Sequence, residues 1–417
     1  MSDPAWIDAA LTAARPQVLG ALLRYFRDLD TAEEAFQEAA LRALAHWPKN
    51  GPPRDPAAWL ILVGRNAALD AARRNRRLEP LDETRELADH DASEASLIER
   101  LDESHYRDDV LRLLFICCHP QLPATQQIAL ALRIVSGLTV QQIARAFLVG
   151  EAAMEQRITR AKGRIARAQV PFETPGPAER VERLAAVSAM LYLLFNEGYS
   201  AGLDPARAPL ALEAIRLARL LLRLYPSEPE VMGLAALMLL QQARRAARFD
   251  SEGEAVLLED QERSRWDAEM IGAGLALIDK AMRHGRPGPY QLQAAIAAVH
   301  ARSASAGDTD WSRIETLYAA LELMEPSPVI RLNRAVAAAK VRGPAEGLAL
   351  LTPLEPRLSN YYLYHGTRGA LLMQLGRASE ARIAFDRAIA LANSASEAIH
   401  IRRQLDRLAR EASSRPP

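Results

Sequence analysis

The sequence predicts an all-α protein with two small helical domains followed by a domain of helical repeats, and three observations support this. Of the 417 residues, 49% are hydrophobic and only 6% are aromatic. Alanine, leucine and arginine dominate the sequence and are strong helix formers, whereas β-branched runs are scarce. Apolar residues recur at helical spacing along most of the chain, and a period of 34 residues appears in its C-terminal part. A chain of this length is expected to form two or three domains.

Residues 1–78 are predicted to form three or four helices. Acidic residues occupy the first turn of the segment 30–47, where the helix dipole favours negative charge. The segment 48–56 contains four prolines and one glycine, so we expect a loop. The helix predicted over 59–77 has an apolar face that suits packing on a bundle and a polar face that offers amide and guanidinium groups to a polyanion. The apolar face carries Leu60, Val63, Ala67 and Ala71, and the polar face carries Asn66, Asp70, Arg73 and Arg77.

The charges of the chain are segregated along the sequence, although the formal net charge is zero. Residues 79–109 contain twelve acidic residues and three arginines, which leaves a net charge of minus nine. Basic residues cluster on both sides, at 73–77 and at 157–167. We therefore expect residues 79–109 to form an acidic linker with partial helix between two basic segments.

Residues 110–170 are predicted to form a helix-turn-helix. Thr139 and Gln142 have the spacing of a capping box that opens a short first helix, and a longer second helix begins at Glu151 after a three-residue turn. Two helices joined in this way are the arrangement that readers of the DNA major groove use. The residues of the second helix expected to face inward are Met154, Ile158, Ala161 and Ile165.

Residues 178–417 follow a proline-rich boundary at 171–177 and are predicted to form stacked helical hairpins. Small and large apolar positions recur with the period of 34 residues, although the register is lost between 245 and 300. Stacked hairpins make a curved surface that suits a bound protein segment. The positions in register include Ala301, Ala335 and Gly369, then Leu317, Leu351 and Phe385. Those that match a tetratricopeptide unit are Gly369, Ala381, Phe385 and Ala388.

Four longer motifs carry a resemblance to a known family. They are Phe-Ile-Cys-Cys-His-Pro at 115–120, Tyr-Leu-Leu-Phe-Asn-Glu-Gly-Tyr at 192–199, Leu-Leu-Glu-Asp-Gln at 257–261 with Arg263, Ser264, Trp266 and Asp267, and Arg-Pro-Gly-Pro-Tyr-Gln-Leu at 286–292. With the two basic segments, they make the chain similar to bacterial extracytoplasmic-function sigma factors of the group with a C-terminal tetratricopeptide-like extension. The resemblance spans nearly the whole chain. It implies a transcription initiation factor that binds core RNA polymerase and promoter DNA and performs no covalent chemistry.

The resemblance also implies roles for individual segments. Residues 30–47 are similar to the polymerase-binding helix, residues 52–77 to the part that melts and reads the minus-ten element, and residues 138–167 to the helix-turn-helix that reads the minus-thirty-five element. The residues expected to bind polymerase are Glu33, Glu34, Gln37, Glu38 and Arg42. Those expected at the minus-ten element are Asn66, Asp70, Arg73, Arg74 and Arg77. Those expected at the minus-thirty-five element are Glu151, Ala153, Gln156, Arg157, Arg160 and Arg164.

The C-terminal part, residues 178–417, is expected to regulate the sigma part in place of a separate membrane anti-sigma factor. One hypothesis is that it packs on the linker or the helix-turn-helix and is needed for promoter opening, and whether it activates or restrains is open. A protein or peptide partner for the repeats is also expected, but the sequence does not identify it. The acidic linker has two interpretations: it mimics nascent RNA near the polymerase active site, or it is a tether that shields the basic helices.

Other functional classes are alternatives to this interpretation. The polar clusters at 33–42 and 66–77 are also typical of ordinary solvated helix faces. The main alternative is a helix-turn-helix regulator or peptide-binding scaffold that does not bind polymerase, and another is a metabolic enzyme fused to a DNA reader. The chain has no nucleophile–base pattern, no phosphate-binding glycine loop and no HExxH motif, so we expect no enzyme activity and no cofactor.

The cysteine content and the N-terminal residues predict the cellular compartment of the protein. Cys117 and Cys118 are the only cysteines, and because a bridge between neighbours is strained, a reducing compartment is expected. With no second cysteine pair, a buried structural role is expected rather than a metal site, and a redox sensor is the alternative. The chain shows no signal peptide and no apolar stretch of membrane-spanning length, so we expect a cytoplasmic protein without membrane contact.

Overall fold

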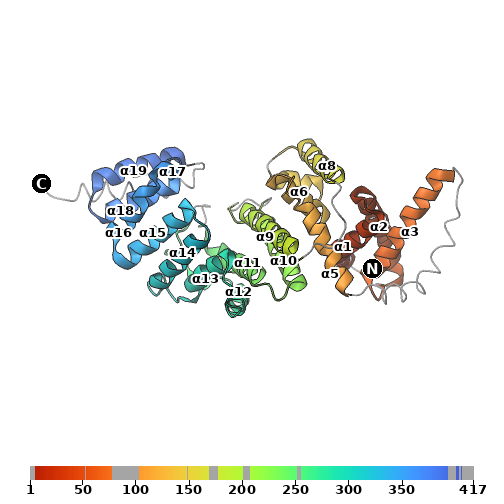
Figure 1. Cartoon of the computed structure of the whole chain (residues 1–417), viewed down its shortest axis with the longest axis horizontal. Coiled ribbons are helices and arrows are strands. Elements are labelled where there is room, and N and C mark those ends of the chain that lie inside the picture. Colours follow the sequence, from red (N-terminus) through yellow and green to blue (C-terminus); the bar gives the residue numbers. More distant parts are fainter. Residues whose placement is uncertain are drawn as a thin grey trace. The chain divides into compact units, whose positions relative to one another are not determined.

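The computed structural model is helical throughout the residues that it describes, which confirms the predicted fold class (Figure 1). Apart from helices and turns, these residues contain one isolated antiparallel bridge, between Phe249 and Ala255. The chain divides into two compact units, Met1–Leu194 and Phe195–Pro417. No described helix is long and apolar enough to cross a lipid bilayer. The residues described are 5–51, 53–77, 103–147, 149–168, 177–200, 207–250, 255–392, 401–402 and 405.

Three long helices form the first part of the first unit, as the sequence predicts. Each of them packs against the other two, and a fourth helix packs on the first. The helices are α1 (Ala5–Phe26), α2 (Leu29–Asn50), α3 (Pro56–Arg77) and α5 (Glu103–Cys117). A Cβ atom on Gly20 would lie 2.8 Å from the Asp109 backbone, so the close approach of α1 to α5 requires glycine there. Most of the predicted linker, residues 79–102, lies outside the described residues, and its last residues belong to α5.

The loop predicted over 48–56 is shorter than expected, because α2 continues to Asn50 and includes Pro48. A proline in the last turn costs one backbone hydrogen bond. The turn is held by Trp47, which is 1% exposed and whose ring lies 5.5 Å from that of Trp59. The next helix then starts at Pro56, where proline is favoured, with the Asp55 carboxylate accepting from the Ala57 and Ala58 N–H groups.

The helix-turn-helix is present where the sequence predicts it. It consists of α7 (Val140–Ala146) and α8 (Glu151–Arg167), which pack together and, through α6 (Ala124–Ile134), continue the unit. Both hydrogen bonds of the capping box between Thr139 and Gln142 are formed, which confirms the predicted start of α7. The inward face of α8 is also confirmed, since its buried residues are Met154, Ile158, Ala161 and Ile165.

The motif at 115–120 packs against the start of the next helix, α9 (Pro177–Tyr199). The Arg183 guanidinium lies 5.5 Å from the centre of the Phe115 ring. Val187, Met190 and Leu191 of α9 are at most 1% exposed. The boundary of the first unit therefore falls inside α9 rather than at the proline-rich segment 171–177.

The second unit is a succession of helices in which each packs on its neighbours in the chain. Five of them begin with proline at the first helical position, which preorganises the backbone there. The long helices are α10 (Pro209–Leu224), α11 (Pro229–Gln242), α12 (Ala268–Met282), α13 (Pro289–Arg302), α14 (Trp311–Met324), α15 (Pro328–Arg342), α18 (Tyr362–Gln374) and α19 (Ala378–Leu391). The short ones are η1 (Arg245–Ala247), η2 (Arg263–Arg265), α16 (Pro344–Leu351), η3 (Thr352–Leu354) and α17 (Glu355–Leu358).

Helix α11 is the centre of the unit and contacts α10, α12 and α13. It is apolar on all sides, and its side chains from Val231 to Leu240 are buried, as expected of a helix surrounded by others. Its Glu230 carboxylate accepts hydrogen bonds from the backbone N–H groups of Tyr290 and Gln291 at 3.1 Å. The motif at 286–292 is thus the start of α13, held by an acid at the positive end of that helix.

The expected repeat positions pack as helix pairs near the C-terminal end (Figure 1). A Cβ atom on Gly369 in α18 would lie 2.6 Å from the Phe385 ring in α19, so only glycine allows this approach. Ala381, Phe385 and Ala388 are at most 1% exposed. One repeat of 34 residues earlier, Leu351 and Leu354 are also buried, at 0% and 5% exposure. Leu317 and Ala320, two repeats before Phe385 and Ala388, are only half-buried, so the periodicity holds best in the last hairpins.

Candidate polymerase- and DNA-binding surfaces

One face of α2 is polar and exposed and carries most of the residues expected to bind polymerase. Glu34, Gln37 and Glu38 are exposed, while Arg42 is half-buried and donates to the Glu38 carboxylate at 3.1 Å. The same helix exposes two leucines, Leu41 and Leu44, at 62% and 50%. Sequence reasoning missed both leucines, although they follow Gln37 and Glu38 at helical spacing. An exposed acidic and apolar helix face of this kind is suited to a protein partner.

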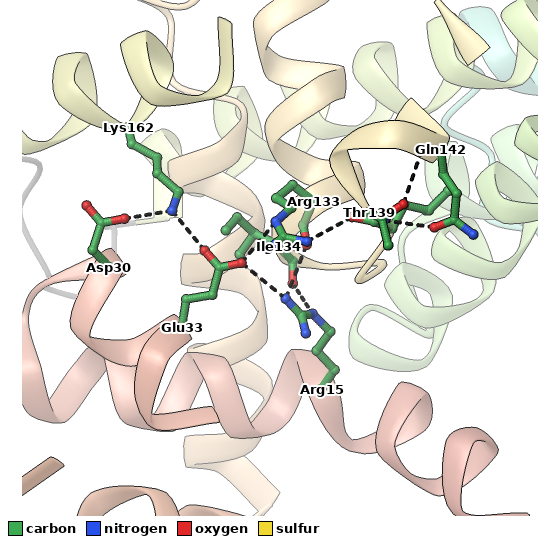
Figure 2. A network of polar contacts seen from close by, with 9 residues as sticks. Arg15, Asp30, Glu33, Arg133, Ile134, Thr139, Gln142 and Lys162 are labelled. Atoms are coloured by element: carbon green, nitrogen blue, oxygen red, sulfur yellow. Dashed lines mark hydrogen bonds and ion pairs between the residues drawn. The ribbon is translucent and has the colours of Figure 1, made fainter. Parts of the chain in front are cut away.

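The fifth residue expected there, Glu33, is buried at 4% exposure and does not belong to this exposed face. Its carboxylate lies among cations from three other helices, which Figure 2 shows from close by. One oxygen lies 3.1 Å from Arg133 Nε and 3.6 Å from Arg15 Nη2, and the other accepts from Lys162 Nζ at 2.8 Å. The Lys162 ammonium also donates to Asp30 at 2.6 Å. We call these residues (Arg15, Asp30, Glu33, Arg133 and Lys162) the Glu33 network.

Arg15 joins this network to the turn that precedes the helix-turn-helix. Its Nε donates to the Ile134 carbonyl at 2.9 Å and its Nη2 to the Arg133 carbonyl at 3.2 Å. Burial lowers the pKa of Arg15 to about 10, and the negative charge of Glu33 opposes that shift. Gly137, with φ +75°, leaves room for Arg15, because a Cβ atom there would lie 2.9 Å from Arg15 Cδ. The Glu33 network thus joins α1, α2, α6 and α8.

The outward face of α8 carries the residues expected to read DNA. Arg157 is half-buried, and Arg164 donates to Gln126 of α6 at 3.3 Å. Lys162 belongs to a different side of α8, where it joins the Glu33 network. The exposed members of the expected set are Glu151, Ala153, Gln156, Arg160 and Arg164. Guanidinium and amide groups free to meet base edges are what major-groove recognition requires.

The polar face of α3 is described only in part. Asn66 and Asp70 are half-buried, and Arg65 Nη2 donates to Asn66 at 3.5 Å. The apolar face is confirmed through Ala67, but Ala71 is exposed, so packing ends before the last turns of the helix. The side chains expected to follow on this helix lie outside the described residues, namely Arg73, Arg74 and Arg77.

The two cysteines lie in the core of the first unit. Burial raises the pKa of the Cys118 thiol to about 12 and that of the Cys117 thiol well above its usual value. Both thiols are therefore held protonated, which removes the thiolate that a redox sensor needs. Among the described residues, no three His, Cys, Asp or Glu side chains are grouped to hold a metal ion.

Acidic residues near Trp311 in the second unit close a turn and cap a helix. Asp310 accepts from the Arg313 N–H at 2.9 Å, at the start of α14. Asp308 accepts from the backbone and hydroxyl of Ser305. These contacts account for the two aspartates without a catalytic role.

Comparison with known proteins gives three family matches and one long relative. Residues 11–78 match sigma-70 region 2, and residues 112–165 match sigma-70 region 4. Residues 183–282 match a family of unknown function, DUF6596. The chain is 65% identical over 413 residues to the uncharacterized protein R00370 of Rhizobium meliloti (strain 1021), which covers 99% of this chain and 98% of the relative. The region 2 match includes α2 and α3, and the region 4 match includes the helix-turn-helix.

The Glu33 network generates a prediction about stability. Replacing Glu33 by alanine leaves Arg15 and Arg133 without their shared anion in a buried site, so we expect a loss of about 3 kcal/mol or more in the free energy of unfolding. Chemical denaturation followed by circular dichroism measures this. The matched control, Glu38→Ala, removes only an exposed pair with Arg42 and is expected to cost less than about 0.5 kcal/mol. Equal effects of the two substitutions would contradict the role of the network.

Proposed function

The chain belongs to the extracytoplasmic-function sigma factors with a C-terminal extension, and from this premise we propose how its surfaces divide the work of initiation. Its sigma-70 domains bind RNA polymerase and promoter DNA. We assign the binding of core polymerase to the exposed face of α2, with Arg42 at its edge. Glu33 would join this face only after the Glu33 network breaks. The residues of the face are Glu34, Gln37, Glu38, Leu41 and Leu44. The observation that supports this most directly is the exposure of two leucines, Leu41 and Leu44, that follow exposed acids on a helix whose opposite side is buried.

The two DNA elements are assigned to α3 and α8. In this assignment the polar face of α3 takes the minus-ten element, with Asn66 and Asp70 at its described part and the arginines 73, 74 and 77 beyond it. Helix α8 takes the minus-thirty-five element, with Gln156, Arg157 and Arg160 toward the bases. Arg164 lies farther along the helix and suits a phosphate contact. The exposure of this face of α8 and the burial of its opposite face support the assignment.

Reading both elements at once requires the first unit to open. The names of the two promoter elements place them about 25 base pairs apart. This corresponds to roughly 85 Å of duplex at 3.4 Å per base pair. Helix α3 is about 33 Å long at 1.5 Å per residue, so it does not bridge that distance. In the structure, α8 contacts α2 through Lys162 at 2.6 Å from Asp30. We therefore assign this arrangement to the free protein and expect the Glu33 network to break when polymerase and promoter bind.

The C-terminal extension is proposed to regulate initiation. The DUF6596 match starts at residue 183, inside α9, whose residues Val187, Met190 and Leu191 are buried in the first unit. Arg183 of that helix contacts Phe115 of the motif at 115–120. The extension is thus built into the folding of the sigma part, which supports a direct influence on promoter opening. The alternative of a regulator or scaffold without polymerase makes no use of the exposed α2 face.

The first prediction tests the polymerase contact. Glu34→Arg with Gln37→Ala reverses the charge of the exposed α2 face without entering the core, so we expect at least a tenfold loss of affinity for core RNA polymerase. Binding of the purified full chain is measured by fluorescence anisotropy. Glu325→Arg with Gln374→Ala, both exposed in the second unit, is the matched control and should bind like the parent. Unchanged affinity of the α2 variant would favour the scaffold or repressor alternative.

The second prediction tests the opening of the first unit. Lys162→Gln removes the cation that joins α8 to Asp30 and Glu33, so the arrangement that must open becomes less stable. We expect the affinity for core polymerase to rise several-fold, because less binding energy is spent on opening. Lys280→Gln, an exposed lysine of the second unit, is the control. A fall in affinity would show that the closed arrangement is the one that polymerase binds.

The third prediction tests the extension. Two truncated chains, lacking residues 178–417 or residues 195–417, are compared with the full chain in promoter-dependent transcription with core polymerase. We expect both to lose promoter output, and the shorter deletion to retain a stable first unit because it keeps the packed part of α9. Unchanged output from the chain that lacks 195–417 would exclude a requirement for the extension.

A further inference from the structure

A cavity in the second unit is lined by the motif at 257–263, for which initiation supplies no role. Its volume is about 320 Å³, within the range of small-ligand sites. One wall is the segment that contains Leu257, Leu258, Glu259 and Arg263. The other walls come from the end of α13, the start of α14, and the facing sides of α15 and α18.

The motif wall is held in place by contacts at both ends. Arg263 Nη1 donates to the carbonyls of His300 and Ser303, and its guanidinium lies 4.7 Å from the centre of the Trp266 ring. At the other end, the Glu259 carboxylate accepts from Lys340 Nζ of α15 at 2.9 Å. The Arg263 end of the wall is thus in place before any ligand arrives, which lowers the cost of binding.

The lining is mostly apolar and has an aromatic side. Leu258, Val336 and Leu371 contribute aliphatic surface, and the Trp311 ring contacts His300 at 5.4 Å between ring centres. Leu257 also lines the cavity and is 37% exposed, so part of this apolar surface meets solvent. An apolar body is therefore the larger part of whatever fills this space.

The charged groups of the lining favour an anion. Of the lining residues in the described chain, Arg263 and Lys340 are cationic and Glu259 is acidic. The Lys340 and Glu259 side chains are 43% and 53% exposed, so their pair is weak and open to competition. Burial, with the positive charges of Arg244 and Arg263, lowers the pKa of His300 to about 4, so His300 is neutral and adds no charge to the lining.

We propose that this cavity binds a small organic anion in which an apolar body carries one carboxylate, with the carboxylate on Lys340 and the body between Trp311, Val336 and Leu371. The hydrogen bond from the Lys340 ammonium to Glu259 shows that this ammonium can bind a carboxylate in this position. Inorganic anions are disfavoured because most of the lining offers them no partner. The proposal goes beyond promoter recognition, since it gives the second unit a ligand of its own.

The test uses the full chain and three probes of one shape, measured by isothermal titration calorimetry and ligand-observed NMR. The probes are 4-phenylbutyrate, 4-phenylbutanol and 4-phenylbutylamine, which differ only in the polar end group. Lys340→Gln removes the cation, and Thr367→Phe places a ring in the space beside α18. Lys280→Gln, a lysine outside the cavity, is the matched control, and circular dichroism verifies that each variant is folded.

We expect 4-phenylbutyrate alone to bind, with affinity unchanged in Lys280→Gln. Lys340→Gln should weaken it roughly tenfold, the size of one lost charge-assisted contact, and Thr367→Phe should abolish binding. Binding of the alcohol or the amine as tightly as the acid would overturn the anion proposal. The proposal would also be overturned if 4-phenylbutyrate did not bind, or if neither cavity variant changed its affinity. Binding of an acidic peptide but of none of these probes would assign the cavity to a protein partner instead.

Discussion

Burying the Glu33 carboxylate removes it from water at a cost that only close cations offset, and this requirement organises the first unit. Arg15, Arg133 and Lys162 reach it from α1, α6 and α8, so the departure of any one of these helices removes a cation from the buried carboxylate. Arg15 also satisfies two backbone carbonyls at the end of α6. A network of this kind contributes more to the specific arrangement of helices than to net stability, because the desolvation of its members opposes their attraction.

In the opening proposed above, the same network separates two states of the first unit that differ in which charged groups they expose. When it is formed, α8 lies against α2 and the two DNA-reading helices belong to one compact body. When it breaks, the charged groups of the Glu33 network return to water, which reduces the cost of opening relative to an apolar interface of the same size. An interface made of charges is therefore compatible with the proposed separation of α3 and α8 on a promoter.

The second unit is organised by close helix contacts rather than by buried charge. Gly369 admits the ring of Phe385, and Gly233 lets α11 approach the start of α13, where a Cβ atom would lie 2.6 Å from the Gln291 nitrogen. The motif at 286–292 forms the start of α13 on Glu230, whereas the motif at 257–263 lines a cavity. Motifs that look equivalent in the sequence thus divide into one that packs helices and one that leaves space. The two motifs differ in role because the motif at 286–292 packs against α11, whereas the motif at 257–263 borders the cavity.

The sequence by itself determined the helices, their faces and the family. The capping box at Thr139, the inward residues of α8 and the proline starts follow from interactions within one or two turns, and local spacing records these directly. The exposed face of α2 could also be predicted, apart from Glu33 and the two leucines. Only the tertiary structure decided that Glu33 is buried, that α9 begins inside the first unit, and that the motif at 257–263 lines a cavity. Glu33 and Lys162 are 129 residues apart, and contacts at that separation depend on how whole helices pack, which local periodicity does not encode.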